Sequence, residues 1–348
     1  MQLKKIHDFK KIYNWNRSKL LIIIVFIFLI LITACTEQAK SPTEQVNQKL
    51  TIVTTFYPLS DIARNIAGDQ AVVSSFIPAG VEPHDYEPTP QDIIKLQSAD
   101  IYVTMGIEFA PFETKLLSSI NGKDSKDSIN GKNSINKNVN IINTANGILL
   151  LDINKNTNNS RTDEDINAEQ SLTGKDPHIW LSPKNMILMA NQFNSELSKL
   201  YPEKAQIFAN NTAIYIQKLT ALDGEFQSGL KNCKKHTILT NHDAFAYLGK
   251  EYGFTQFALS GLKPEKEPTP QTLKKLIDIA RENNIKYVFY EELVDPRIAD
   301  AVANEIHATP LELNPLEGTK DPIKNDYFVL MKKNLYNLEL ALECSEVQ

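Results

Sequence analysis

Between residues 50 and 120, short apolar runs alternate with segments of helical periodicity. The pattern predicts strands at 51–56, 71–77 and 101–105, and helices at 59–67, 89–96 and 109–120. Thr89, Pro90 and Asp92 form a near capping box at the start of the second of these helices. Alternating short strands and helices are typical of parallel βαβ units, whose ligands bind at the loops that follow the strands.

The pattern breaks between residues 119 and 175, where Asn, Lys, Ser and Asp dominate and a nine-residue repeat begins at Ser119 and again at Ser128. This composition buries little apolar surface, so we expect a low-complexity loop. Within it we predict a strand at 139–142 and a weaker one at 148–151. The loop contains no His, which argues against a role in gathering metal.

The alternation resumes after a strongly helical region at 185–200 and 203–230. The predicted elements that follow are strands at 237–240, 254–259, 286–290 and 310–313, and helices at 244–252, 273–283, 298–306 and 327–342. The sequence Glu-Pro-Thr-Pro-Gln occurs at 87–91 and again at 267–271, although Thr-Pro-Gln is also simply a good helix start. We expect an α/β fold of two lobes, each with a mainly parallel sheet, joined by a long rigid linker helix.

The N-terminus has the features of an export signal. Six basic residues precede an apolar run at 20–32, which is short for a membrane-spanning helix, and the run ends in Ile32-Thr33-Ala34-Cys35. This ending resembles a lipobox, so we expect cleavage before Cys35 and lipidation of its sulfur. The alternative is an uncleaved anchor helix, and both interpretations place the remainder outside the cytoplasm, held to the cell membrane.

These patterns give five segments. They are a signal peptide at 1–34, a tether at 35–49, an N-terminal lobe at 50–182, a linker helix at 183–201 and a C-terminal lobe at 202–348. The net charge of −5 and the pI near 5.8 argue against a nucleic-acid partner. Cys233 and Cys344 either form a disulfide or are two buried thiols, since neither has zinc-finger spacing.

Three histidines lie in predicted loops, namely His84, His178 and His242. His178 lies between Pro177 and Pro183 just before a predicted helix, on a loop that the prolines stiffen. Taken alone it is either a metal ligand or a structural histidine beside Trp180. Together the three could converge between the lobes. We assign His236 and His307 to structure or surface.

The histidine segments resemble those of the zinc- and manganese-binding lipoproteins that serve ABC importers, and the resemblance covers nearly the whole chain from about residue 50. It is carried by Gly80-Val81-Glu82-Pro83-His84-Asp85-Tyr86-Glu87-Pro88, Asp176-Pro177-His178-Ile179-Trp180-Leu181-Ser182-Pro183 and Thr240-Asn241-His242-Asp243-Ala244-Phe245. The resemblance implies two α/β lobes, ligands at His84, His178 and His242, and delivery of metal to an ABC permease. We expect a monomer.

The resemblance places the fourth ligand in the segment Leu313-Asn314-Pro315-Leu316-Glu317. We favour Glu317 over Asn314, because a carboxylate is the better zinc ligand, and keep Glu291 as a reserve. We expect Glu82, Asp85 and Asp243 to orient or cap, with Asp243 capping the helix that follows it.

Three imidazoles and one carboxylate favour Zn²⁺. The manganese receptors of the family that the chain resembles have Glu in place of the third His. Mn²⁺ remains the alternative metal. A secreted zinc hydrolase is the competing class. It requires an open coordination position, and the chain lacks His-Glu-x-x-His. We therefore do not expect an enzyme. A role in cell adhesion would rest only on the names of relatives.

Overall fold

The computed structural model describes residues 49–106, 113, 139–152, 174–262, 268–322 and 324–345. The signal segment with Cys35, most of the tether, the nine-residue repeat and nearly all of the helix expected at 109–120 lie outside these residues. Within the described part of the chain, no helix is long and apolar enough to cross a membrane.

The first sheet has four parallel strands in the order β2-β1-β3-β4. Its elements are β1 (Leu50–Thr54), α2 (Tyr57–Ala67), β2 (Ala71–Ser75), α3 (Pro90–Ser98), β3 (Ile101–Thr104) and β4 (Asn140–Asn143). Apart from the half-buried Thr51, the residues of β1 and β3 are buried on both faces, as expected for the central strands of a parallel sheet.

The second sheet is also four-stranded and parallel, in the order β6-β5-β7-β8. Its elements are β5 (Thr237–Thr240), α8 (Ala246–Tyr252), β6 (Thr255–Ala258), α9 (Pro270–Glu282), β7 (Tyr287–Tyr290), α10 (Arg297–Ile306), β8 (Thr309–Glu312) and α11 (Tyr327–Ala341). In both sheets the strand that comes second along the chain lies at one edge, followed by the first, the third and the fourth. The predicted fold class of two parallel α/β lobes is confirmed.

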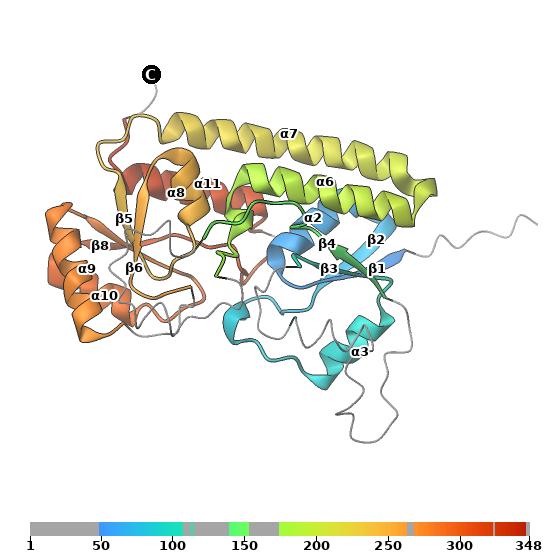
Figure 1. Cartoon of the computed structure of the whole chain (residues 1–348), viewed down its shortest axis with the longest axis horizontal. Helices are drawn as coiled ribbons and strands as arrows, with labels where there is room; N and C mark the ends of the chain where they lie inside the picture. The colour runs from blue at the N-terminus through green and yellow to red at the C-terminus, as the bar shows by residue number, and fades with distance from the viewer. Residues whose placement is uncertain are drawn as a thin grey trace, which may run out of the picture. The chain divides into compact units, whose positions relative to one another are not determined.

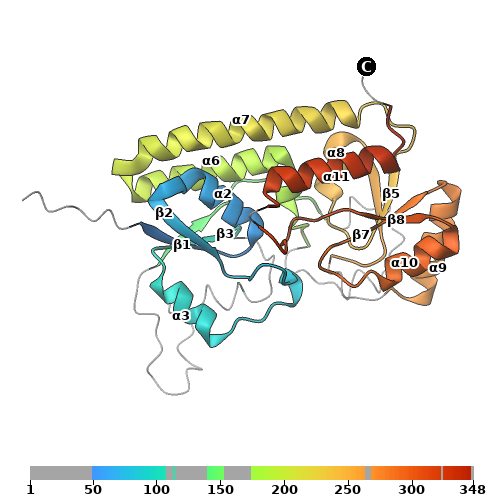
Figure 2. The ribbon, with the colours of Figure 1, turned by 180° about the vertical axis from the view of Figure 1, so that it is seen from behind.

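Two long helices, α6 (Pro183–Leu200) and α7 (Ala205–Gly229), follow the first sheet and pack against each other. The predicted linker at 183–201 corresponds to α6, which packs on α2 and β4 of the first sheet. The chain reverses at Pro202 and returns along α7, which contacts α2 and α11 (Figures 1 and 2). Helix α7 therefore runs from α2, which packs on the first sheet, to α11 of the second lobe.

Helix starts follow the capping signals of the sequence. Thr89 and Asp92 form a complete capping box at α3, and Thr269 accepts the backbone N–H of Thr272 at α9. Ser182 accepts the N–H of Asn185 at the start of α6, with Pro183 in the first turn. The repeated Thr-Pro-Gln thus opens a helix in each lobe.

The predicted strand at 148–151 is wrong. Residues 148–150 pair with no neighbouring strand, and Leu151 donates its N–H to the Tyr247 hydroxyl at 2.9 Å. Only an isolated bridge joins Asp152 to Lys175. Ile148, Leu150 and Leu151 pack against the core without forming a ladder, whereas Leu149 is exposed.

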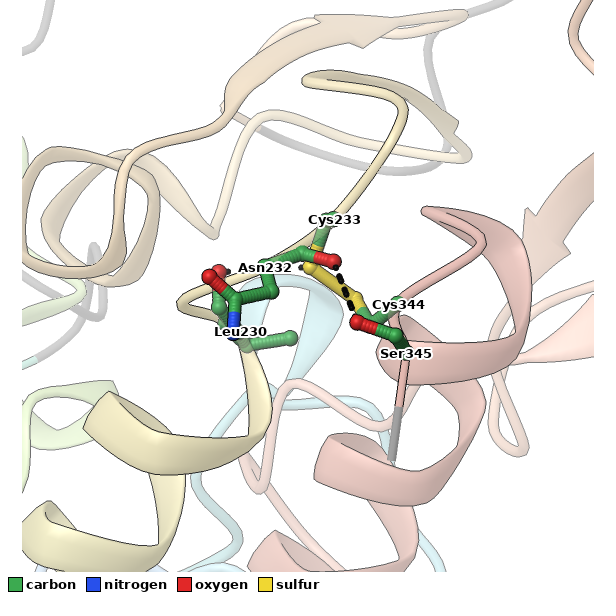
Figure 3. Close-up of a disulfide and its surroundings, with 5 residues drawn as sticks. All are labelled: Leu230, Asn232, Cys233, Cys344 and Ser345. Atoms are coloured by element: carbon green, nitrogen blue, oxygen red, sulfur yellow. Dashed lines mark hydrogen bonds between the residues drawn. A yellow bond between two sulfur atoms is a disulfide. The ribbon is translucent and has the colours of Figure 1, made fainter. Parts of the chain in front are cut away.

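A disulfide joins Cys233, after α7, to Cys344, after α11 (Figure 3). Beside it, Ser345 donates its backbone N–H to the Asn232 carbonyl at 3.2 Å. The two cysteines are 111 positions apart in the sequence, and the segment between them includes all of the second sheet. It ties the C-terminal segment to the end of α7.

Candidate metal centre

Four loops bring His84, His178, His242 and Glu317 together. His84 lies in a 3₁₀ turn (Pro83–Asp85) that follows β2, and His178 immediately precedes a 3₁₀ turn (Ile179–Leu181). His242 follows β5 and Glu317 follows β8. Three of the four thus come from the carboxyl ends of parallel strands, where ligands bind in sheets of this kind.

The Glu317 Oε1 atom lies among three imidazole nitrogens. It is 3.3 Å from His84 Nε2, 3.2 Å from His178 Nε2 and 3.4 Å from His242 Nε2. The ligand atoms of all four residues lie within 4.8 Å of one another. In a tetrahedral zinc site with bonds of about 2.0–2.1 Å, neighbouring ligand atoms are about 3.3–3.4 Å apart. The three distances from Glu317 Oε1 therefore match those between neighbouring ligand atoms of a tetrahedral site.

The centre is shielded from solvent. His178 and His242 are 0% exposed, Glu317 is 2% exposed and His84 is 7% exposed. Among the described residues, His178 Nε2, His242 Nε2 and Glu317 Oε2 are buried without a well-formed hydrogen bond. Buried polar atoms that lack partners are costly, and a bound cation would satisfy them.

Two of the imidazoles are oriented by further carboxylates. His178 Nδ1 lies 2.8 Å from Asp176 Oδ1, and the same oxygen accepts the His178 backbone N–H at 2.9 Å. His242 Nδ1 lies 2.6 Å from Glu291 Oε1. In both rings the Nε2 atom therefore remains directed at Glu317. A carboxylate behind a ligand histidine is a common feature of zinc sites.

Asn314 and Glu291, the other candidates for the fourth ligand, have different contacts. The Asn314 side-chain oxygen accepts the Leu316 N–H at 2.8 Å, within a turn in which Leu316 has φ 57°. Asn334 of α11 binds both the N–H and the carbonyl of Asn314. Asn314 thus shapes the loop that carries Glu317, and Glu291 contacts His242 on the side away from Glu317.

The charges of the centre depend on one another. Burial lowers the pKa of His178, but the Asp176 and Glu317 carboxylates outweigh it and raise that pKa. Burial also opposes the charged form of His242, yet Glu291 and Glu317 raise its pKa well above the usual range. Burial would raise the pKa of Glu317, whereas the imidazoles of His84, His242 and His178 hold it well below its usual value. The carboxylates thus favour the protonated forms of His178 and His242.

Among the other acidic residues expected near the ligands, Glu82 has the orienting role and Asp243 does not cap. Glu82 accepts the His84 backbone N–H at 3.1 Å, and burial together with Glu317 raises the pKa of Glu82 to about 9. Asp243 accepts a hydrogen bond from Gln256 Nε2 at 2.6 Å. Helix α8 begins three residues later, at Ala246, and its N-cap residue Phe245 provides no side-chain cap. The predicted cap at Asp243 is wrong.

Sequence reasoning missed the hydrogen bonds that fasten the His178 segment to the second lobe. Trp180 donates its indole N–H to the Pro315 carbonyl at 2.7 Å, and the Tyr327 hydroxyl donates to the Trp180 carbonyl at 2.8 Å. The Tyr247 hydroxyl donates to the Asp176 carbonyl at 2.8 Å. Only the indole beside His178 signalled such a role, because a buried Trp usually bonds its N–H.

Two parallel sheets with a buried group of three histidines and one carboxylate define a two-lobed α/β protein with a candidate metal centre. The family model described as "ZnuA: Zinc-uptake complex component A periplasmic" matches residues 52–341. The chain belongs to the ZnuA family.

The relatives support this assignment. The "Zinc-binding lipoprotein AdcA" of Streptococcus pneumoniae is 34% identical over 325 residues, covering 92% of this chain and 60% of that relative. The chain thus spans about 60% of the length of this relative. The "High-affinity zinc uptake system protein ZnuA" of Bacillus subtilis is 31% identical over 92% of this chain and 97% of its own length.

A solved structure has the same fold. The Zn(II)-bound ZnuA-like domain of AdcA from Streptococcus pneumoniae matches with a TM-score of 0.67 and 34% identity. The match covers 85% of this chain and 100% of that domain. The two-lobed fold is thus shared with a domain that binds Zn(II).

Proposed function

We propose that the protein is an extracytoplasmic receptor that captures Zn²⁺ between its two lobes and delivers it to an ABC permease. The observation that carries the proposal is the position of Glu317 Oε1, which lies 3.2–3.4 Å from the Nε2 atoms of three buried histidines. The ligands are His84, His178, His242 and Glu317. The names of the relatives support zinc as the metal.

The ligand set favours zinc over manganese. Imidazole nitrogen suits Zn²⁺, whereas Mn²⁺ is better served by oxygen ligands and octahedral geometry. The group contains three imidazoles and one carboxylate. A fully surrounded ion has no open position for a reactive water, so the arrangement supports capture rather than hydrolysis.

We propose that Cys35 carries the lipid that holds the receptor at the outer face of the cell membrane. Residues 36–49 then form a tether, because they are polar and lack periodicity. A monomer is sufficient for this function, because one chain supplies all four ligands.

A metal titration of the full-length chain in detergent tests the proposal. Zn²⁺ should bind one to one and more tightly than Mn²⁺, and His178→Ala should abolish tight binding. His236→Ala is the matched control, because His236 is exposed and precedes β5, whereas the ligand His242 follows that strand. Steady hydrolysis of model peptides or esters that requires His84 would overturn the receptor assignment.

Uptake of zinc tests delivery. Cells whose only zinc receptor is the Glu317→Ala variant should grow poorly in zinc-depleted medium and recover when zinc is added. Cells with the Cys35→Ala variant should release the receptor from the membrane fraction. Normal membrane retention of that variant would instead support an uncleaved anchor helix.

A further inference from the structure

Glu291 lies directly behind one of the metal-binding histidines. It follows β7, and His242 follows the neighbouring strand β5, so the parallel pairing of these strands brings the two residues to the same edge of the sheet. Glu291 Oε1 is 2.6 Å from His242 Nδ1. Glu291 is 4% exposed and His242 is 0% exposed, so water has little access to either.

We propose that Glu291 is a positioning residue for zinc capture, which presents the Nε2 atom of His242 to the metal. This inference rests on the proposed function. A neutral imidazole carries one proton, and the nitrogen that keeps it cannot bind metal. By accepting the Nδ1–H, Glu291 leaves the lone pair on Nε2, which lies 3.4 Å from Glu317 Oε1.

The contact also fixes the rotation of the ring. The imidazole ring of His242 can rotate about its Cβ–Cγ bond, and a flip of the ring would move Nδ1 away from Glu291. The Nδ1···Oε1 contact therefore favours one of the two flipped orientations of the ring. Because both residues are buried, no solvent can replace this acceptor. Loss of the acceptor should therefore cost metal affinity even though Glu291 does not touch the metal.

A purely structural role explains Glu291 poorly. Its second oxygen, Oε2, is buried and has no hydrogen-bond partner among the described residues. A buried carboxylate with a single hydrogen-bond partner is unfavourable for folding. The presence of this carboxylate beside a proposed metal ligand is explained if the carboxylate helps that ligand to bind metal.

Glu291 tests this idea more cleanly than Asp176, the carboxylate behind His178. Asp176 accepts both the Nδ1–H and the backbone N–H of His178. Its removal would reshape the loop as well as free the ring. Among the described residues, the Glu291 side chain hydrogen-bonds only to the side chain of His242, so its replacement isolates the effect on the ring.

The test compares Glu291→Met, which fills a similar volume without an acceptor, with Glu291→Gln, whose amide oxygen still accepts the Nδ1–H. Zinc affinity of the full-length chain in detergent is measured by competition with a chromophoric chelator. Co²⁺ serves as a second probe, because its visible absorption reports the coordination geometry. Glu292→Met is the matched control, since Glu292 is the neighbouring residue and lies close to Lys320.

We expect Glu291→Met to weaken zinc binding by about 10- to 100-fold and to alter the Co²⁺ spectrum. Glu291→Gln should recover most of the affinity and the spectrum, and Glu292→Met should behave like the wild type. Unchanged affinity in Glu291→Met would overturn the inference, as would Glu291→Gln matching Glu291→Met in both measurements. One-to-one zinc binding by the wild type separately tests the proposed function, so the two failures are distinguishable.

Discussion

Replacing Glu317 by Ala is the most informative change to the centre. It removes the oxygen that lies within 3.4 Å of all three imidazole Nε2 atoms and the only carboxylate among the four proposed ligands. The loop itself should persist, because Asn334 and Trp180 hold it through the backbone of Asn314 and Pro315. The change in zinc affinity of this variant therefore measures the loss of the Glu317 carboxylate and not a change in the loop.

The magnitude follows from the ligand count. Four-ligand zinc sites bind with about 10–16 kcal/mol, or roughly 2.5–4 kcal/mol for each ligand. Since about 1.4 kcal/mol is a factor of ten, Glu317→Ala should weaken zinc binding by roughly 10²- to 10³-fold. Glu291→Ala should weaken it less, because Glu291 acts through His242.

The assay is chelator competition at fixed pH, with unfolding followed by circular dichroism to verify that each variant is folded. Glu305→Ala is a suitable control, because its carboxylate pairs with Arg281 on the exposed surface. If Glu291→Ala weakens zinc more than Glu317→Ala does, the assignment of the fourth ligand is wrong. A Glu317→Ala variant with wild-type affinity would refute the reasoning from geometry.

Three further changes test other parts of the account. Cys233→Ser should lower the free energy of unfolding by up to about 4.7 kcal/mol, the value for a loop of about 100 residues, and denaturant curves with and without reductant measure this. Zinc affinity should fall as pH decreases, because carboxylates raise the pKa values of His178 and His242 and protons then compete with the metal. Calorimetry should show that zinc binding releases protons, and an affinity independent of pH would contradict this prediction. Trp180→Phe removes the donor to the Pro315 carbonyl; it should cost about 1–3 kcal/mol of stability and weaken zinc binding, and a variant as stable as the wild type would contradict this.

Most helices and strands could be predicted because local signals and tertiary packing agree. Thr89 caps the helix that the sequence assigns to it, and the strand at 237–240 is found with those bounds. The segment 148–151 misled the prediction because an apolar run looks the same whether or not a neighbouring strand pairs with it. That information is tertiary.

The candidate centre was predictable in part. The histidine motifs pointed to His84, His178 and His242, and ligand chemistry favoured Glu317 over Asn314. The contact of Glu291 with His242 depends on β5 and β7 being neighbours in the sheet, which no local pattern records. Likewise, Gln256 bonds Asp243 across two neighbouring strands, so a plausible helix cap has another partner.

A crystal structure of the zinc-loaded protein, with anomalous diffraction at the zinc edge, would show which residues hold the metal. We expect a single strong metal peak bonded to the Nε2 atoms of His84, His178 and His242 and to Oε1 of Glu317, at about 2.0–2.2 Å from each. A peak coordinated by Asn314 or Glu291 in place of Glu317, or one located outside this group, would contradict it.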